Sequence, residues 1–358
     1  MKNKTIQRIL VIRFRQMGDA ILSTVLLNAL RANYPNAVID FVLNTKIAPL
    51  FENHPSVDNI VSFTEDERHH AFTYIKKVWN VVHSNHYDVI IDMRSTVNTM
   101  LFALFSPSTS YRIGLRKSYT KLAFNYLMDG CGQKKNMLDH NLNFLLPLPN
   151  IKNHEKSLSL GITDKEKNDF KDYMIMQGIN FLNPIMLCGV TTKIEAKSWA
   201  VERMIEILHR LMVQYPSLQI IFNYAPGIEE EKAHKIYEML DSPKNIFINI
   251  QARSSRQMAA MASACTFYFG NEGGARHIVQ TMGRPSLTIC SPMANKITWI
   301  PQDGKIKAVG IASTDIVASE QLTDMSYDQI FNVITVDYVW KKLLTFCEEL
   351  HIEPSGRV

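Results

Sequence analysis

Residues 11–30, VIRFRQMGDAILSTVLLNAL, decide the fold that this sequence predicts. Residues 9–12 form an apolar, β-branched run that is typical of a buried strand. A short polar turn with Gly18 follows, and from Ala20 to Leu30 apolar residues recur at the spacing of one helical stripe. A strand, a glycine turn and a helix in this order form the first half of a βαβ unit.

Asp19 lies where this turn becomes the helix, at the predicted carboxyl end of the first strand. Open α/β sheets bind their ligands at this end of their strands, so the carboxylate is a candidate catalytic group. Aspartate is also a favoured N-cap residue, and such a cap stabilises a helix by about 1 kcal/mol. The residues around Asp19 leave both interpretations open.

The same alternation of strands and helices continues through both halves of the chain. In the first half we expect strands at 37–43, 57–63, 87–92 and 111–114 and helices at 71–83 and 97–104. In the second half we expect strands at 184–190, 218–223, 246–250, 266–270 and 286–290 and helices at 200–215, 229–240, 255–264 and 275–282. This rhythm predicts an α/β protein with two Rossmann-like, doubly wound parallel sheets.

A stretch rich in proline and asparagine, residues 146–164, separates the two halves. We therefore expect a first domain over residues 1–160 and a second over residues 161–325. Residues 326–358 form a helical segment that begins at a capping box, Ser326 to Gln329. We expect its last helix to cross back and pack on the first domain.

Composition limits the functions that this chain can have. Its 358 residues are 46% hydrophobic and 20% charged, which is typical of a globular protein and sufficient for two domains. The net charge of +5 fits an anionic substrate or contact with an acidic membrane surface. The sequence contains no basic stripe with interleaved aromatic residues, so it does not indicate a nucleic-acid partner.

Cysteine usage and hydropathy predict the compartment. The five cysteines are scattered and form no CxxC pair, which favours a reducing compartment without disulfides or a zinc site. No apolar run reaches the roughly 20 residues that a membrane span needs. The first residues lack the apolar core of a signal peptide. We therefore expect a cytoplasmic protein that can contact a membrane surface.

The strongest motif is FGNEGGARHIVQTMGRP, residues 269–285, in which a strand ends and a helix begins near Ala275. Gly273 and Gly274 allow a ligand close to the backbone, and the free amides of a helix start bind phosphate. Glu272 can accept hydrogen bonds from sugar hydroxyls, and His277 lies in the first turn. The alternative is an ordinary strand–helix joint with a solvated glutamate and a packed histidine.

Two further loops carry suitable groups. In VTTKIEAKSW, residues 190–199, two threonines precede Lys193 and Lys197, and lysine can stabilise a departing diphosphate. In GIEEEK, residues 227–232, Glu229 can accept from ribose hydroxyls. A solvated basic loop and an acidic helix start are the alternatives.

Several catalytic motifs do not occur. The chain has no Asp-x-Asp pair for a divalent metal, no GxSxG elbow and no P-loop. It also has no GxGxxG after the first strand, which argues against a nicotinamide dehydrogenase. We expect neither a metal nor a cofactor.

These blocks together resemble the bacterial heptosyltransferases of glycosyltransferase family 9, over nearly the whole chain. The resemblance is carried by ILVIRFRQMGDAILSTVLLNAL, TTKIEAKSW and GNEGGARHIVQTMGRPS and by their spacing. It implies the GT-B architecture, in which two Rossmann-like domains face each other across a cleft. It also implies inverting, metal-independent transfer of a sugar, typically heptose from ADP-heptose, to a lipopolysaccharide or related glycan acceptor at the cytoplasmic face of the inner membrane.

The resemblance assigns roles to individual positions. Asp19 matches the catalytic base, which takes a proton from the acceptor hydroxyl. The matching donor-binding positions are Thr191, Thr192, Lys197, Glu229, Glu272, Gly273, Gly274 and His277.

This chain departs from the family pattern in the donor loop. The family usually has Asp at position 272 and Ser or Thr at position 273, and Arg276 is unusual. Two other functions on the same architecture therefore stay open. One is a sugar-nucleotide epimerase, which needs no acceptor. The other is a sugar-nucleotide-binding protein without catalysis.

Overall fold

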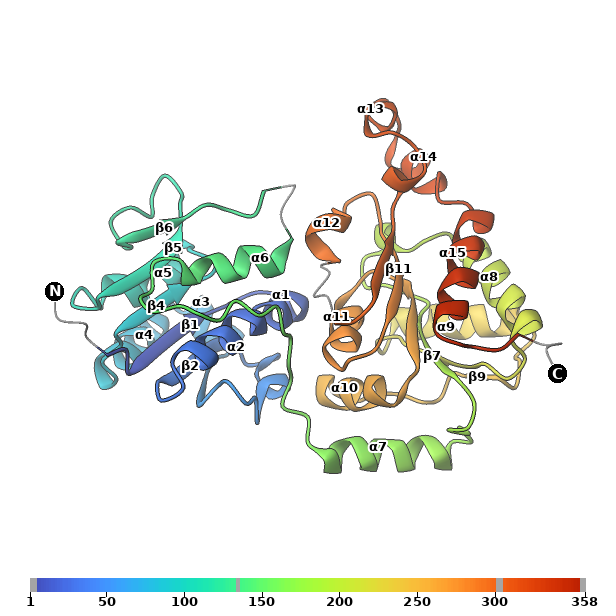
Figure 1. Cartoon of the computed structure of the whole chain (residues 1–358), viewed down its shortest axis with the longest axis horizontal. Helices are drawn as coiled ribbons and strands as arrows, with labels where there is room; N and C mark the ends of the chain where they lie inside the picture. Colours follow the sequence, from blue (N-terminus) through green and yellow to red (C-terminus); the bar gives the residue numbers. More distant parts are fainter. Residues whose placement is uncertain (1–4, 133–135, 301–304, 355–358) are drawn as a thin grey trace. The chain divides into compact units, whose positions relative to one another are not determined.

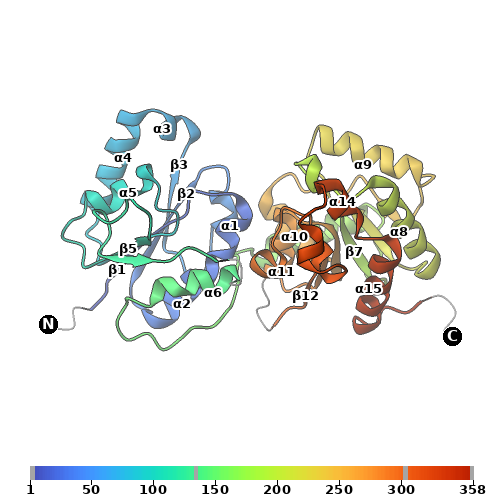
Figure 2. The same cartoon turned by 90° about the horizontal axis from the view of Figure 1, so that it is seen from above.

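The computed structural model describes residues 5–132, 136–300 and 305–354, which fold into two compact units that divide between Thr163 and Asp164. Each unit is built on one six-stranded sheet in which all paired strands are parallel. Helices cover both faces of each sheet (Figures 1 and 2), which confirms the prediction of two doubly wound α/β sheets. No helix within the described ranges is both long and apolar enough to span a bilayer.

The strands of the first unit lie in the order β3-β2-β1-β4-β5-β6. They are β1 (Arg8–Ile12), β2 (Val38–Asn44), β3 (Asn59–Phe63), β4 (Val89–Asp92), β5 (Tyr111–Leu115) and β6 (Tyr126–Met128). The α-helices are α1 (Met17–Leu22), α2 (Thr24–Asn33), α3 (Glu65–His69), α4 (Ala71–Ser84), α5 (Val97–Leu104) and α6 (Met137–Leu142). Helices α1, α2 and α6 contact one another, as α4 does with α3 and α5.

The central strand β1 shows why its sequence is apolar throughout. Ile9, Leu10, Val11 and Ile12 are all fully buried, because helices cover a parallel sheet on both faces. Ile9 pairs with β2 on one side and with β4 on the other.

The second unit repeats this arrangement, with the strand order β12-β11-β10-β7-β8-β9. Its strands are β7 (Ile185–Gly189), β8 (Gln219–Phe222), β9 (Ile246–Phe247), β10 (Phe267–Asn271), β11 (Ser286–Ile289) and β12 (Ala308–Ile311). Its α-helices are α7 (Asp164–Met176), α8 (Val201–Gln214), α9 (Ile228–Met239), α10 (Ser255–Ala264), α11 (Gly274–Thr281), α12 (Lys296–Trp299), α13 (Ser319–Leu322), α14 (Tyr327–Asn332) and α15 (Val336–Glu349).

Counted from the first strand of each unit, both sheets have the order 3-2-1-4-5-6. In this order the direction of winding reverses between the first and fourth strands, and the loops at their carboxyl ends separate there. This switch point lies between β1 and β4 in the first unit and between β7 and β10 in the second. Both are therefore the expected places for ligands.

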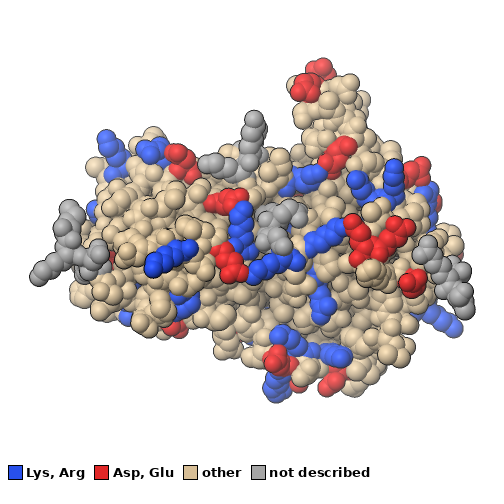
Figure 3. All heavy atoms as spheres, viewed as in Figure 1, with Lys and Arg blue, Asp and Glu red and all other residues tan. Residues whose placement is uncertain are grey.

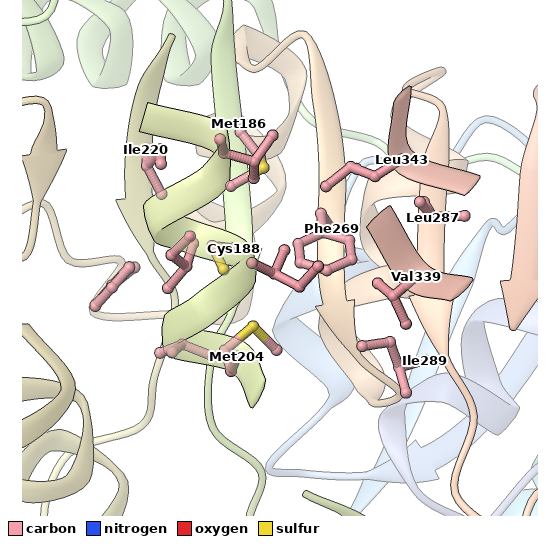
Figure 4. Packing of buried hydrophobic residues seen from close by; sticks show 14 of the residues in the cluster. Met186, Cys188, Met204, Ile220, Phe269, Leu287, Ile289, Val339 and Leu343 are labelled. Atoms are coloured by element: carbon pink, nitrogen blue, oxygen red, sulfur yellow. The ribbon is translucent and has the colours of Figure 1, made fainter. Parts of the chain in front are cut away.

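Helix α15 belongs to the second unit, which corrects the prediction that it packs on the first domain. Its residues Val339, Leu343, Phe346 and Cys347 are buried in the same core as strands β7, β10 and β11. Figure 4 shows Val339 and Leu343 directed toward Phe269, Leu287 and Ile289. The apolar stripe of the helix was predicted correctly, but amphipathicity does not identify the surface that a helix covers.

Other local predictions need smaller corrections. The single helix expected over residues 20–30 is interrupted at Ser23, whose hydroxyl donates to the carbonyl oxygen of Ala20 at 2.6 Å. Gly18 lies inside α1, where its φ is not positive, so it does not form the predicted turn. The edge strands β6 and β12 were not predicted, and β9 is shorter than expected. The capping box at Ser326 is confirmed.

Candidate active site

Asp19 is a buried carboxylate at the switch point of the first unit. Helix α1 begins at Met17 with Gln16 as its N-cap, so Asp19 lies in the first turn and is not the capping residue. Its Oδ1 accepts from Nη2 of Arg13 at 3.0 Å, and its Oδ2 accepts from Nε of Arg15 at 3.3 Å. The capping alternative is therefore wrong, and two guanidinium groups fix the orientation of the carboxylate.

Arg13 is itself buried beneath this site. Its Nη1 donates to the carbonyl oxygen of Met93 at 2.8 Å, so it links the loops that follow β1 and β4. Burial lowers the pKa of Arg13, and the charge of Asp19 opposes this effect. The buried pair places fixed, opposite charges at the carboxyl end of the sheet.

The loop after β4 brings more charge to the same end of the sheet. Asp92 is fully buried, and its Oδ1 accepts from the amides of Arg94 at 3.0 Å and Ser95 at 2.7 Å. Burial raises the pKa of Asp92, while these hydrogen bonds oppose the shift. Burial lowers the pKa of Arg94, and the nearby charges of Arg15 and Arg68 lower it further. Several guanidinium groups therefore gather around Asp19, and this cluster was not predicted from the sequence.

In the second unit, Thr191 and Glu229 meet although they lie far apart in the sequence. Thr191 follows β7, and its hydroxyl donates to Oε2 of Glu229 in the first turn of α9 at 3.2 Å. Thr192 instead donates to the carbonyl oxygen of Ile194 at 2.6 Å, which shapes the loop before Lys197. Glu229 thus lies both at an acidic helix start and beside the switch point.

Lys197 and Glu272 form a second pair at this switch point. Nζ of Lys197 lies 3.5 Å from Oε1 of Glu272, which follows β10. The hydroxyl of Ser291 donates to the same carboxylate oxygen. An ammonium group and a carboxylate held together in this way can bind an anion and a hydroxyl group side by side.

The glycine pair leads directly into α11, as predicted. Gly273 is the N-cap and has extended backbone, and Gly274 is the first residue of the helix. A Cβ added at Gly273 would meet nothing within 4 Å, so the space beside this backbone is open. The amides of the first helical turn have no partners within the helix, which makes this end suitable for phosphate.

His277 lies further along α11 and is buried beside Arg276. Nδ1 of His277 accepts from Nη2 of Arg276 at 2.6 Å, which leaves the proton of the neutral ring on Nε2. Burial, together with the charge of Arg276, lowers the pKa of His277 well below 6.5. Arg276 also donates to Gln280 and to the carbonyl oxygen of Trp299, both at 2.8 Å. His277 is therefore a neutral group that can donate one hydrogen bond.

Asn271 organises these loops and was not predicted. Its side chain accepts from the amide of Trp199 at 2.8 Å and donates to the carbonyl oxygens of Gly189 and Val190 at 3.1 and 3.2 Å. Gly270 has a φ of 142°, and a Cβ there would lie 2.5 Å from the carbonyl oxygen of Gly189. The glycine and the asparagine together hold the loops after β7 and β10 close to each other.

The predicted site residues thus form two groups, with Asp19 in the first unit and the other eight in the second. No group of three His, Cys, Asp or Glu side chains that could hold a metal occurs within the described part of the chain. A pocket of about 560 Å³ between α7 and α10 in the second unit contains none of the predicted residues.

Twin parallel sheets of the same strand order, with a helix start suited to phosphate at the second switch point, are features of the GT-B architecture. A family model described as glycosyltransferase family 9 (heptosyltransferase) matches residues 75–317. The chain therefore belongs to glycosyltransferase family 9.

Individual relatives agree with this assignment. Lipopolysaccharide heptosyltransferase 1 of Campylobacter coli is 20% identical over 295 residues, covering 79% of this chain and 83% of that protein. The crystal structure of a family 9 glycosyl transferase from Veillonella parvula matches with a TM-score of 0.82 at 18% identity, over 98% of this chain and 99% of that one. The ADP-heptose lipopolysaccharide heptosyltransferase II of E. coli matches with a TM-score of 0.73 at 17% identity, over 96% and 100%. The two structural matches show the fold.

Proposed function

We propose that this glycosyltransferase moves a heptose from ADP-heptose to a lipid-linked glycan of the lipopolysaccharide core, with inversion and without a metal. The observation that carries this proposal is the position of the residues at the two switch points. Asp19 stands at the first, and Lys197, Glu272 and the start of α11 stand at the second. The names of the relatives from Campylobacter coli and E. coli support the choice of sugar and acceptor.

In the proposed mechanism, Asp19 is the general base. Each carboxylate oxygen has two lone pairs, so an oxygen that accepts from an arginine can still accept from a hydroxyl group. Asp19 takes the proton as the acceptor oxygen attacks the anomeric carbon of the donor. The guanidinium groups around it favour an acceptor that carries carboxylate or phosphate groups.

The second unit binds the donor and stabilises the leaving group. Lys197 and the first amides of α11 stabilise the negative charge that develops on the departing diphosphate. Glu272 accepts from hydroxyl groups of the sugar, and Glu229 with Thr191 binds the ribose. His277 donates its Nε2 proton within this donor site.

The test is Asp19→Asn, because asparagine keeps an acceptor for Arg13 but cannot take a proton. We expect transfer to fall by about a thousandfold, as general-base catalysis contributes roughly 10²–10⁴. The rise in melting temperature caused by ADP should be unchanged. Asp129→Asn, at an exposed carboxylate of the same unit, is the matched control.

Three outcomes contradict parts of the proposal. Unchanged turnover in Asp19→Asn removes Asp19 from the role of base. Release of an epimerised sugar without any acceptor identifies an epimerase. Binding of the donor without turnover under any acceptor condition identifies a binding protein.

A further inference from the structure

Helix α4 in the first unit has an apolar surface that is broader than the part buried in the core. Tyr74, Val78 and Val82 are buried in the core. On the outer side, Phe72 and Trp79 are 81% and 49% exposed, and Ile75 between them is 43% exposed. Their spacing places these three side chains on one stripe. This outer stripe does not contribute to the core of the unit.

Helix α5 extends the stripe into a broader surface. It contacts α4, and Figure 2 shows the two helices beside each other. The ring of Trp79 packs edge-on against Phe105 with centroids 5.3 Å apart, and Val97 and Leu104 of α5 are 65% and 40% exposed. We call the outer surface of these two helices, with Phe72, Ile75, Trp79, Val97 and Leu104, the α4–α5 face.

A loop on the other side of α5 adds both apolar and basic groups. Ala123 and Phe124 of this loop pack against Met100 and Ala103 of α5. Between these anchors and β5, Tyr119 and Leu122 are 46% and 89% exposed. Residues 115–122, LRKSYTKL, supply three cations next to them.

The charge of this region is mainly positive. Within residues 69–128 the acidic residues are Asp88 and Asp92, and both are buried. The same residues contain seven lysines and arginines, at positions 76, 77, 94, 112, 116, 117 and 121. At the edges of this region Glu67 pairs with Lys77 and Asp129 pairs with Arg116, which leaves the other cations in excess. In Figure 3, basic side chains are visible over the β5–β6 end of the first unit, with an acidic side chain beside them. A partner for the α4–α5 face should therefore be both apolar and negatively charged.

These properties favour a lipid surface over a second copy of the chain. In a symmetric dimer the same patch occurs on both copies, so the lysines would face lysines. Aromatic and aliphatic side chains flanked by cations are typical of surfaces that bind anionic bilayers. We propose that the α4–α5 face docks the protein on an anionic lipid bilayer.

The position of this face connects it to the proposed function, on which this part of the inference rests. The hydroxyl of Tyr119 donates to the carbonyl oxygen of Ser95 at 3.3 Å, and Val97 begins α5 two residues later. Both therefore lie at the carboxyl end of β4, the end of the sheet that holds Asp19. A bilayer on the α4–α5 face would present the head group of a lipid-linked acceptor at this end.

The test is sedimentation of the full chain with vesicles, without donor or acceptor. We expect it to bind vesicles of phosphatidylethanolamine with phosphatidylglycerol, more weakly at high salt, and to bind phosphatidylcholine vesicles poorly. Phe72→Ser combined with Trp79→Ser should lower the partition coefficient about tenfold or more, because both side chains lose their burial in the bilayer. Lys76→Glu combined with Lys121→Glu should lower it about tenfold on the anionic vesicles only.

The control is Met176→Ser combined with Leu182→Ser, two residues of the second unit that are 82% and 93% exposed. This pair should bind vesicles like the wild type. Phe72→Ser alone keeps the ring contacts of Trp79, and an unchanged circular dichroism spectrum and urea unfolding curve show that the variants are folded. The inference is overturned if the wild type does not bind anionic vesicles, or if the Phe72/Trp79 pair and the control pair bind alike. It is also overturned if the protein is a dimer and the Phe72/Trp79 change dissociates it, because the α4–α5 face would then bind a second copy of the chain.

Vesicle binding also separates this inference from the proposed function. Asp19→Asn should bind vesicles as the wild type does, because Asp19 is not part of the α4–α5 face. Failure of sugar transfer with intact vesicle binding would reject the proposed reaction alone.

Discussion

The contacts of Asp19 determine which substitution can test its role. Replacement by alanine would leave the buried guanidinium of Arg13 without its carboxylate, and breaking one partner of a buried pair costs about 3–5 kcal/mol. Loss of activity in that variant would then reflect either catalysis or folding. Asparagine keeps the shape and one acceptor oxygen, so its effect reports on proton transfer.

A second buried residue of the first unit, His54, makes the stability of the fold depend on pH. Its Nδ1 accepts from the amide of Ser56 at 3.1 Å, and its Nε2 lies 3.2 Å from the carbonyl oxygen of Ser159. The ring is therefore neutral, with its proton on Nε2. Burial lowers the pKa of His54 from 6.5 to about 4.

We predict that the free energy of unfolding falls as the pH decreases from 6.5 toward 4. In this window the unfolded chain binds a proton at His54 and the folded chain does not, so acid favours unfolding by up to about 1.4 kcal/mol per pH unit. Above pH 6.5 this contribution is constant. Buried His277 adds to the loss in the same direction.

Urea unfolding at several pH values in the wild type and in His54→Gln measures this effect. The glutamine variant should be less stable at neutral pH and should depend less steeply on pH below 6.5. Equal slopes in the two proteins would show that His54 is not responsible.

At this scale the sequence predicts the positions of candidate groups better than it predicts the contacts that hold them in place. Asp19, Lys197, Glu272 and the glycine pair were predictable because each follows an apolar run that is recognisable as a strand. The role of Asn271 depends on backbone groups 72 to 82 residues away in the sequence, and nothing in its local sequence indicates them. The local signal for a role of Asn271 was that an asparagine directly follows a predicted strand.

At the scale of elements, the placement of α15 leads to a prediction. Leu343 is fully buried in the core of the second unit, so Leu343→Ala should destabilise that unit by about 2–5 kcal/mol. Hydrogen exchange should become faster in peptides from β7, β10 and β11, while peptides from β1 and β4 keep their protection. Mass spectrometry of the exchanged peptides measures this.

Leu26→Ala provides the reciprocal control in the first unit. Leu26 is fully buried in α2 of the first unit, so this change should accelerate exchange in β1 and spare β7 and β10. Faster exchange in β1 caused by Leu343→Ala would contradict the assignment of α15 to the second unit.

Elements were predictable where their pattern was strong. The strands beside the switch points, β1, β4, β7 and β10, read as continuous apolar runs because they are covered on both faces. The edge strands β6 and β12 pair on one side only and are partly exposed, so they do not form the continuous buried run that identifies the other strands. The break at Ser23 depends on a side-chain hydrogen bond that periodicity does not reveal.

For the whole molecule, the repeated strand order explains how two units with dissimilar sequences present comparable sites. The switch point is a property of topology, so each sheet offers an open carboxyl end whatever its side chains are. The first unit fills this end with a carboxylate and arginines, and the second fills it with a lysine, a glutamate and a helix start. The proposed division of labour between acceptor and donor follows from this difference in charge.

The donor itself can be identified by thermal shift, because a ligand that binds only the folded state stabilises it by mass action. At a concentration of 100 times its dissociation constant a ligand adds about 2.7 kcal/mol. For a unit of this size that corresponds to a rise in melting temperature of about 5–10 °C. We expect ADP and ADP-heptose to produce this rise and UDP- and GDP-sugars to produce little. Lys197→Met should reduce the shift for every diphosphate, because the ammonium group interacts with the phosphates and not with the base. A larger shift with a UDP- or GDP-sugar would keep the fold and the diphosphate site and replace the proposed donor.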